Sequence, residues 1–235
     1  MKKFSLLLIL ISSFSFAQET SKFFDASDKF FKQYVSNGRV KYEEIKQNPN
    51  DLHELLSLAE EIKVSTKDPD VYKAFWINSY NIAVINGIVK QFPVKSPMDI
   101  EGFFNVEKHI LGQRSVTLDD IEKILLLGNF PEESRFHFVL VCAAKGCPPL
   151  IAEAYKPETL EKQLQLQTVK AMNSSEFVKV EKETLLLSEL MNWYQKDFTK
   201  GGVSLIDYIN KYRKTTLPTN LKIKFHNYNW ELNDL

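Results

Sequence analysis

Several features that mark particular classes of protein are scarce or missing in this sequence of 235 residues. Neither sign of charge is in excess, because the chain has 30 basic and 30 acidic residues. A chain so close to neutral lacks the positive field that binds polyanions, so we expect no nucleic-acid partner. Internal repeats and low-complexity tracts are also missing. The hydrophobic fraction of 44% and the aromatic fraction of 12% suffice for a full core, which indicates a globular protein.

The hydrophobic run at the N-terminus is too short for a membrane span. Lys2 and Lys3 precede a nearly all-apolar stretch, residues 4–11, whereas a spanning helix needs roughly 20 residues. Ser15 and Ala17 then provide small residues before a cleavage site, which predicts a signal peptide cleaved after Ala17. No cysteine follows the stretch, and this excludes a bacterial lipoprotein anchor. We therefore expect export to the periplasm or the extracellular space, with no membrane span after cleavage.

Turn residues and helix caps divide the rest of the chain into helices and short strands. Asp68 followed by Pro69 is typical of a helix start. We expect helices at residues 20–36, 51–63, 69–92, 118–128, 156–172, 189–198 and 205–213, and extended segments at 39–44, 105–118, 135–142, 177–187 and 221–232. Because no regular βαβ rhythm occurs, the sequence predicts an α+β fold with a small mixed or antiparallel sheet. We expect a single domain, in which a helical N-terminal region, residues 18–66, packs on an α+β core, residues 67–235.

Both cysteines lie in one short segment, FHFVLVCAAKGCPPL at residues 136–150. A turn through AAKG would bring Cys142 and Cys147 within bonding distance, and exported proteins meet an oxidising environment. So small a loop would contribute only about 2 kcal/mol in the chain-entropy model. Alternatively, Cys147 is a nucleophile at the start of a short helix, whose dipole would lower the pKa of the thiol. A zinc site is a third alternative, but the second cysteine pair of many zinc sites is missing, so we expect no metal.

A nucleophilic Cys147 would need a histidine as its base. If residues 135–142 form a strand, His137 and Cys142 point to opposite faces, which argues against a dyad between these two. His109, on the arm of a hairpin that turns at Gly112, is the first candidate, and His137 is the second. The structural alternative for each is a strand residue whose ring is satisfied by a backbone carbonyl.

Two asparagines stand out on the segment FWINSYNIAVINGI. Asn78 and Asn81 are three residues apart on an otherwise apolar helix stripe. Burying a carboxamide without partners costs roughly 1–3 kcal/mol, so both side chains must find hydrogen bonds. In a functional role they orient a catalytic imidazole or bind a substrate amide, and in a structural role they tie down a neighbouring loop. Glu122, in LDDIEKIL, is either an orienting carboxylate or an exposed helix residue.

The segments FWINSYNIAVI, HILGQRSVTLDDIE, HFVLVCAAKGCPPL and LLLSELMNWYQKDF, in this order, resemble the domain-of-unknown-function 547 family over about residues 40–232. Many members have asparagine and serine where this chain has Val141 and Gly146, and often histidine where it has Lys123. The resemblance implies no established activity or cofactor. It does imply a shared site at the family's signature positions, which are Trp76, Asn78, Tyr80, Asn81, His109, Glu122, His137, Cys142, Cys147 and Pro148.

These residue types lead to a functional hypothesis with one main alternative. The hypothesis is an exported thiol hydrolase or acyl-transferase of papain or transglutaminase type, without a cofactor, that acts on a peptide, amide or ester. Cys147 would be the nucleophile and His109 or His137 the base, with Asn78, Asn81 or Glu122 orienting the imidazole. Trp76, Asn78, Tyr80 and Asn81 would bind the substrate. The alternative is a non-catalytic envelope binding module that takes a small molecule or peptide and contains a structural disulfide between Cys142 and Cys147.

Overall fold

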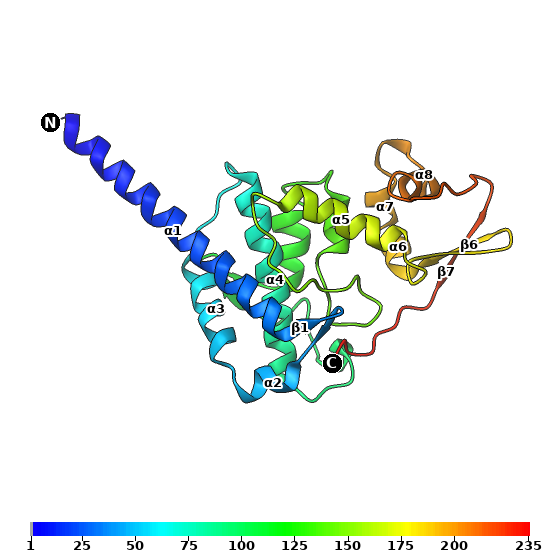
Figure 1. Cartoon of the computed structure of the whole chain (residues 1–235), viewed down its shortest axis with the longest axis horizontal. Helices are drawn as coiled ribbons and strands as arrows, with labels where there is room; N and C mark the ends of the chain where they lie inside the picture. The colour runs from blue at the N-terminus through cyan, green and yellow to red at the C-terminus, as the bar shows by residue number, and fades with distance from the viewer. Residues whose placement is uncertain (1) are drawn as a thin grey trace.

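A computed structural model gives the backbone of residues 2–235 and the side chains of residues 18–235 (Figure 1). The expected signal peptide, residues 1–17, lies outside the part whose side chains are described, so its cleavage stays a prediction. Among the described residues, no helix is long and apolar enough to cross a membrane. Helix accounts for about 49% and strand for about 13%, in small sheets, which confirms the predicted α+β class.

The N-terminal half is helical. Aromatic residues on α1 (Lys2–Tyr34) turn inward and pack the helix on α3 (Asn50–Glu61) and on α4 (Pro69–Gln91), and α2 (Tyr42–Gln47) lies against the far end of α4. Five aromatic residues of α1 are buried, namely Phe23, Phe24, Phe30, Phe31 and Tyr34. They belong to a hydrophobic cluster that continues to residue 164, so the N-terminal helices share one core with the rest of this half.

Helix α4 is the central element of this half. Its start is as predicted, because the Asp68 carboxylate accepts a hydrogen bond from the backbone N–H of Val71 and Pro69 occupies the first position. Unlike an amphipathic surface helix, α4 is buried on every side from Ala74 to Val89. Asn78 and Asn81 on this buried helix hydrogen-bond backbone groups of neighbouring segments, and this positions those segments around it.

The second half consists of a small sheet with short helices. Strand β5 (Val178–Glu181) pairs antiparallel with β6 (Thr184–Ser188), which pairs parallel with β7 (Lys222–His226), so the sheet is mixed as expected.

The N-terminal half contains two separate two-stranded hairpins, β1 (Val35–Ser36) with β2 (Arg39–Val40) and β3 (His109–Leu111) with β4 (Arg114–Val116). The remaining elements are α5 (Leu160–Met172), α6 (Glu189–Trp193), α7 (Gln195–Phe198), α8 (Leu205–Asn210) and the short helices η1 (Pro97–Asp99), η2 (Asp120–Leu126), η3 (Ser134–Phe138) and η4 (Lys200–Gly202).

The prediction of a strand at residues 135–142 is wrong. Residues Ser134–Phe138 form the 3-10 helix η3, and the segment that follows has no partner strand. Its backbone is held by a side chain instead, because Asn81 hydrogen-bonds both Val139 and Val141. The β-branched and aromatic residues that suggested a strand are simply buried, and strand propensity largely reflects such burial.

Other boundaries also differ from the prediction. The expected segment at 39–44 is a strand only at Arg39–Val40, the helix expected at 118–128 is the π-helix η2, and the helix expected at 189–198 is broken into α6 and α7.

The C-terminal segment after β7 crosses back to the helical half, where its red trace ends near β1 in Figure 1. It runs beside residues 142–147, which we call the cysteine loop. The N–H groups of Lys145 and Gly146 donate to the carbonyls of Glu231 and Asn229, both at 2.8 Å. The N–H of Asn233 donates to the carbonyl of Ala143 at 2.9 Å. This pairing joins the two halves and fixes residues 228–230 against the cysteines.

Candidate functional site

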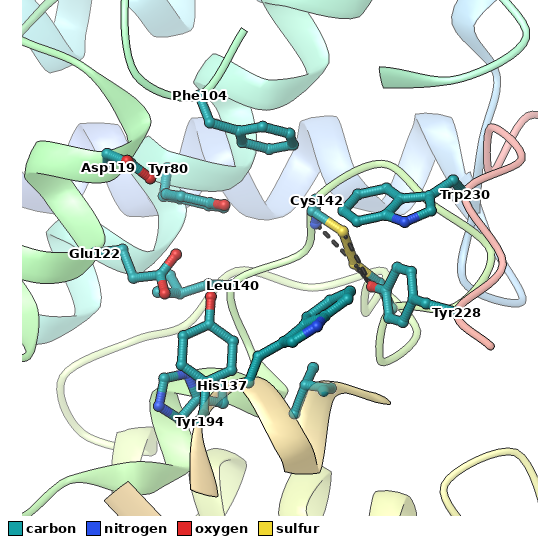
Figure 2. A pocket seen from close by; sticks show the side chains of 13 residues that line it. Tyr80, Phe104, Asp119, Glu122, His137, Leu140, Cys142, Tyr194, Tyr228 and Trp230 are labelled. Carbon is teal, nitrogen blue, oxygen red and sulfur yellow. Dashed lines mark hydrogen bonds between the residues drawn. A yellow bond between two sulfur atoms is a disulfide. The ribbon is translucent and has the colours of Figure 1, made fainter. Parts of the chain in front are cut away.

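A pocket of about 270 Å³ lies where the two halves meet (Figure 2). Its walls come from α4, the π-helix η2, η3, the cysteine loop, α6 and the C-terminal segment, so they are assembled from most of the chain. The lining side chains are Tyr80, Phe104, Asp119, Glu122, His137, Leu140, Cys142, Cys147, Leu190, Trp193, Tyr194, Tyr228 and Trp230. Five of the predicted signature positions, including both cysteines, therefore meet here with aromatic residues from distant parts of the sequence.

Cys142 and Cys147 form a disulfide in the wall of this pocket, with their Cα atoms 6.4 Å apart. The Tyr228 hydroxyl covers the bond, at 3.0 Å from the Sγ of Cys147 and 3.2 Å from the Sγ of Cys142. The expected short helix after Cys147 is not formed, because the next helix begins only at Leu160. The argument that a helix dipole would activate the Cys147 thiol is therefore wrong.

His137 lines the same pocket as both cysteines. The sequence argument that His137 and Cys142 point apart depended on a strand, and η3 takes its place. The imidazole stacks on the Tyr194 ring at 3.8 Å between centroids, and its Nε2 lies 2.9 Å from the Oδ2 of Asp197. The hydrogen bond from His137 lowers the pKa of the Asp197 carboxyl.

His109 lies elsewhere. It is buried on β3 and is not among the described residues that line the pocket. Burial lowers the pKa of its imidazole, and no described residue hydrogen-bonds its Nε2. The structure thus brings His137, and not His109, into the pocket with Cys147.

Glu122 is buried in the pocket wall, with 8% of its surface exposed. The alternative of an exposed helix residue is thereby wrong. Its backbone carbonyl accepts from the N–H of Leu127, five residues on, which is the bond that widens a π-helix. Short π-helical segments occur frequently at functional sites. The Oε1 of Glu122 has no hydrogen-bond partner among the described residues.

The tyrosines beside Glu122 remain neutral phenols. Burial raises the pKa of Tyr194, and the negative charge of the nearby Glu122 carboxylate raises it further. The pKa of Tyr80 is also raised, first by burial and then by the charge of Glu122. Both side chains can therefore donate a hydrogen bond at neutral pH, but neither can supply a positive charge.

Asn78 and Asn81 bind backbone segments, as in the structural alternative. The Asn78 carboxamide donates to the Tyr155 carbonyl at 2.7 Å and accepts from the Tyr155 N–H at 3.0 Å. The Asn81 carboxamide donates to the Val139 carbonyl and accepts from the Val141 N–H, both at 2.9 Å. Asn81 thereby holds the chain directly before the disulfide.

The other predicted binding residues are divided. Tyr80 lines the pocket, whereas Trp76 is fully buried elsewhere, against Phe75 and Gly112. The lining also includes residues that were not among the predicted site residues, namely Phe104, Asp119, Trp193, Tyr194, Tyr228 and Trp230. A signal for part of this set exists in the aromatic density of MNWYQKDF and YNWEL. No group of three or more His, Cys, Asp or Glu side chains among the described residues could hold a metal ion.

Fold and site together define an α+β protein with a disulfide in the wall of an aromatic pocket. Residues 64–170 match the family model described as "Protein of unknown function, DUF547", which confirms the resemblance seen in the sequence. The matched region contains α4, the π-helix and the disulfide, but not the aromatic residues of α6 and of the C-terminal segment. Comparisons with curated proteins and with solved structures gave no match.

Proposed function

We propose that the mature protein is an exported, non-catalytic binding module whose pocket holds a small ligand. The observation that carries this proposal is the composition of the pocket wall. Both sulfurs of the wall are in a disulfide, most of the lining is aromatic or apolar, and a few polar groups converge on the space. Sites for small molecules typically combine an apolar lining with few polar groups, in volumes from roughly 300 Å³ upward. A pocket of about 270 Å³ suits a ligand at the small end of this range.

The disulfide supports binding over catalysis. A thiol hydrolase needs a thiolate at Cys147, and that sulfur is bonded to Cys142. Disulfides persist in oxidising compartments, so the bond also supports the proposed export.

The pocket walls are held in place before any ligand arrives. Asn81 fixes the chain before Cys142, and the hydrogen bonds of Lys145 and Gly146 fix the segment that carries Tyr228 and Trp230. A preformed site binds more tightly because little conformational entropy is lost on binding.

A panel of small molecules of all charge types, screened by thermal unfolding of the oxidised protein, tests the proposal. At 100 times its Kd a ligand stabilises by about 2.7 kcal/mol, which is roughly 5–11 °C for a domain of this size. Trp193→Ala should abolish the shift, and because Trp193 is 48% exposed its removal leaves no core cavity. Leu166→Ala, which removes a similarly exposed residue on α5 outside the pocket, should keep it. The proposal fails if no compound binds, or if binders stabilise the Trp193 variant as much as the parent.

One observation favours a second candidate, the thiol hydrolase of the sequence hypothesis in a reduced form. Cys147 and His137 line the same pocket, so reduction would place a thiol and an imidazole there together. Cys142→Ser frees the Cys147 thiol without any reductant. Hydrolysis of a p-nitrophenyl ester by this variant, but not by Cys147→Ser, would favour the hydrolase. Equal background rates in the two variants would favour the binding module.

A further inference from the structure

We propose that the ligand of this pocket carries a cationic amine, which pairs with Glu122, and an apolar body that lies on the aromatic residues opposite. This inference rests on the proposed binding function. Three observations carry it: the unpaired acceptor on one wall, the aromatic cluster on the other, and the lack of a counterion for Glu122 among the described residues.

The first wall presents a buried carboxylate oxygen without a partner. Glu122 is 8% exposed, and its Oε1 accepts no hydrogen bond from any described residue. In Figure 2 its carboxylate lies on the side of the pocket opposite the disulfide and Trp230. A buried carboxylate oxygen without a hydrogen-bond partner is costly, and an ionised carboxylate can only accept hydrogen bonds. A hydrogen-bond donor that also carries positive charge would supply both the missing hydrogen bond and a counterion for the carboxylate.

None of the residues whose side chains are described supplies such a cation to the pocket. No lysine or arginine is among the described residues that line the pocket. The adjacent Lys123 is paired with Asp119 at 2.7 Å. His137 is the remaining basic group in the lining, and its Nε2 is already bonded to Asp197. A ligand would therefore have to provide the cationic partner of the Glu122 carboxylate.

The second wall is a cluster of three aromatic rings, Trp193, Tyr228 and Trp230. Ring centroids are 4.9 Å apart between Trp193 and Tyr228, 4.7 Å between Tyr228 and Trp230, and 5.7 Å between the two tryptophans. Indole and phenol faces carry partial negative charge, so they attract cations and also give a large apolar contact. Trp193 is 48% exposed, which leaves half of its surface free for a ligand.

Ligands of other charge fit these walls less well. An anion would meet the carboxylates of Glu122 and Asp119 together with the negative faces of the rings. A neutral polyol could donate hydrogen bonds to Glu122, but it would leave the buried charge uncompensated. A compact amine with an apolar or aromatic body satisfies both walls.

Three isosteric probes test this inference by titration calorimetry on the oxidised mature protein at pH 7. They are 2-phenylethylamine, which is protonated at this pH, neutral 2-phenylethanol and anionic phenylacetate. Hydrogen bonds to charged groups are the stronger class, so the amine should bind at least about tenfold more tightly than the alcohol. Phenylacetate should bind most weakly. Glu122→Gln keeps the shape of the side chain and should abolish the preference for the amine, whereas Glu158→Gln, at an exposed position outside the pocket, should keep it.

The inference is overturned if the alcohol or phenylacetate binds as tightly as the amine, or if Glu122→Gln retains the preference. Absence of binding by all three probes also overturns it, because the amine offers both features that the walls require. The thermal-unfolding panel tests the binding module separately. That proposal would stand if a neutral or anionic compound stabilised the parent protein but not the Trp193→Ala variant. If Glu122→Gln does not fold, the three-probe comparison on the parent protein still decides.

Discussion

Replacing Asn81 by alanine should destabilise the protein far more than an ordinary polar substitution. The Asn81 carboxamide joins the Val139 carbonyl and the Val141 N–H at 2.9 Å each, in a region where both valines are buried. No neighbouring strand pairs with residues 139–142, so nothing nearby replaces these two bonds.

The expected magnitude follows from the two backbone groups that lose their partner. An unsatisfied buried group costs about 1–3 kcal/mol, so the loss of two partners in Asn81→Ala should cost about 2–6 kcal/mol in the free energy of unfolding. Such a loss is a large share of the roughly 5–15 kcal/mol that stabilises a typical domain. For a chain of this size it corresponds to a decrease in Tm of about 4–24 °C.

Urea unfolding of the oxidised protein, followed by tryptophan fluorescence, measures this effect. Asn86→Ala is the matched control, because Asn86 is a largely buried asparagine of the same helix for which no hydrogen bond to a described residue is found. The control should cost under about 1.5 kcal/mol. If Asn81→Ala costs no more than Asn86→Ala, the two hydrogen bonds do not hold the segment before the disulfide, and the reasoning is refuted.

Two further predictions concern the sulfurs and the buried histidine. Replacing Cys142 and Cys147 together by serine should lower the free energy of unfolding by about 2 kcal/mol, as the chain-entropy model gives for so short a loop; urea unfolding that shows no loss would mean that the bond does not constrain the unfolded chain. The hydrogen bond from His137 lowers the pKa of Asp197 below the ordinary 3.8, so its stabilisation is complete above pH 3.8 and is lost as the pH falls through the lowered value. Asp197→Asn should therefore be less stable than the parent at pH 6, with a smaller difference at pH 2.5, and a difference independent of pH would contradict this assignment.

Local capping signals were predicted correctly from the sequence, because they involve residues three apart or closer. The Asp68 carboxylate accepts from the Val71 N–H at the start of α4, as predicted. Similar local bonds occur elsewhere, where the Asp120 carboxylate accepts from the Thr117 N–H and the Ser204 hydroxyl accepts from the N–H of Asp207. Such interactions depend on few atoms beyond the segment itself, so tertiary context does not change them.

Residues 135–142 show where sequence-based prediction fails. Their composition is that of a strand, yet the segment is held by the Asn81 side chain, which lies about 60 residues away in the sequence. A bond of this kind leaves no periodic pattern in either segment. A strand would place His137 and Cys142 on opposite faces. Because the segment is not a strand, this did not hold, and the proximity of His137 to the cysteines was not foreseen.

The candidate site was predicted in part. The signature positions Tyr80, Glu122, His137 and the cysteine pair do meet in one pocket, whereas His109, Trp76 and Asn78 lie outside its lining. The aromatic wall was not predicted, because Tyr228 and Trp230 reach the pocket only through hydrogen bonds between the C-terminal segment and the cysteine loop. Contacts across some 80 residues are decided by the whole fold.

The bond between Cys142 and Cys147 determines whether the pocket contains a nucleophile. The intact mass of the protein after alkylation under denaturing conditions, with and without prior reduction, measures the state of this bond directly. We expect no alkyl additions without reductant and two after reduction. Two additions without reductant would mean that both thiols are free, which would contradict the structural disulfide and return the thiol hydrolase to first place.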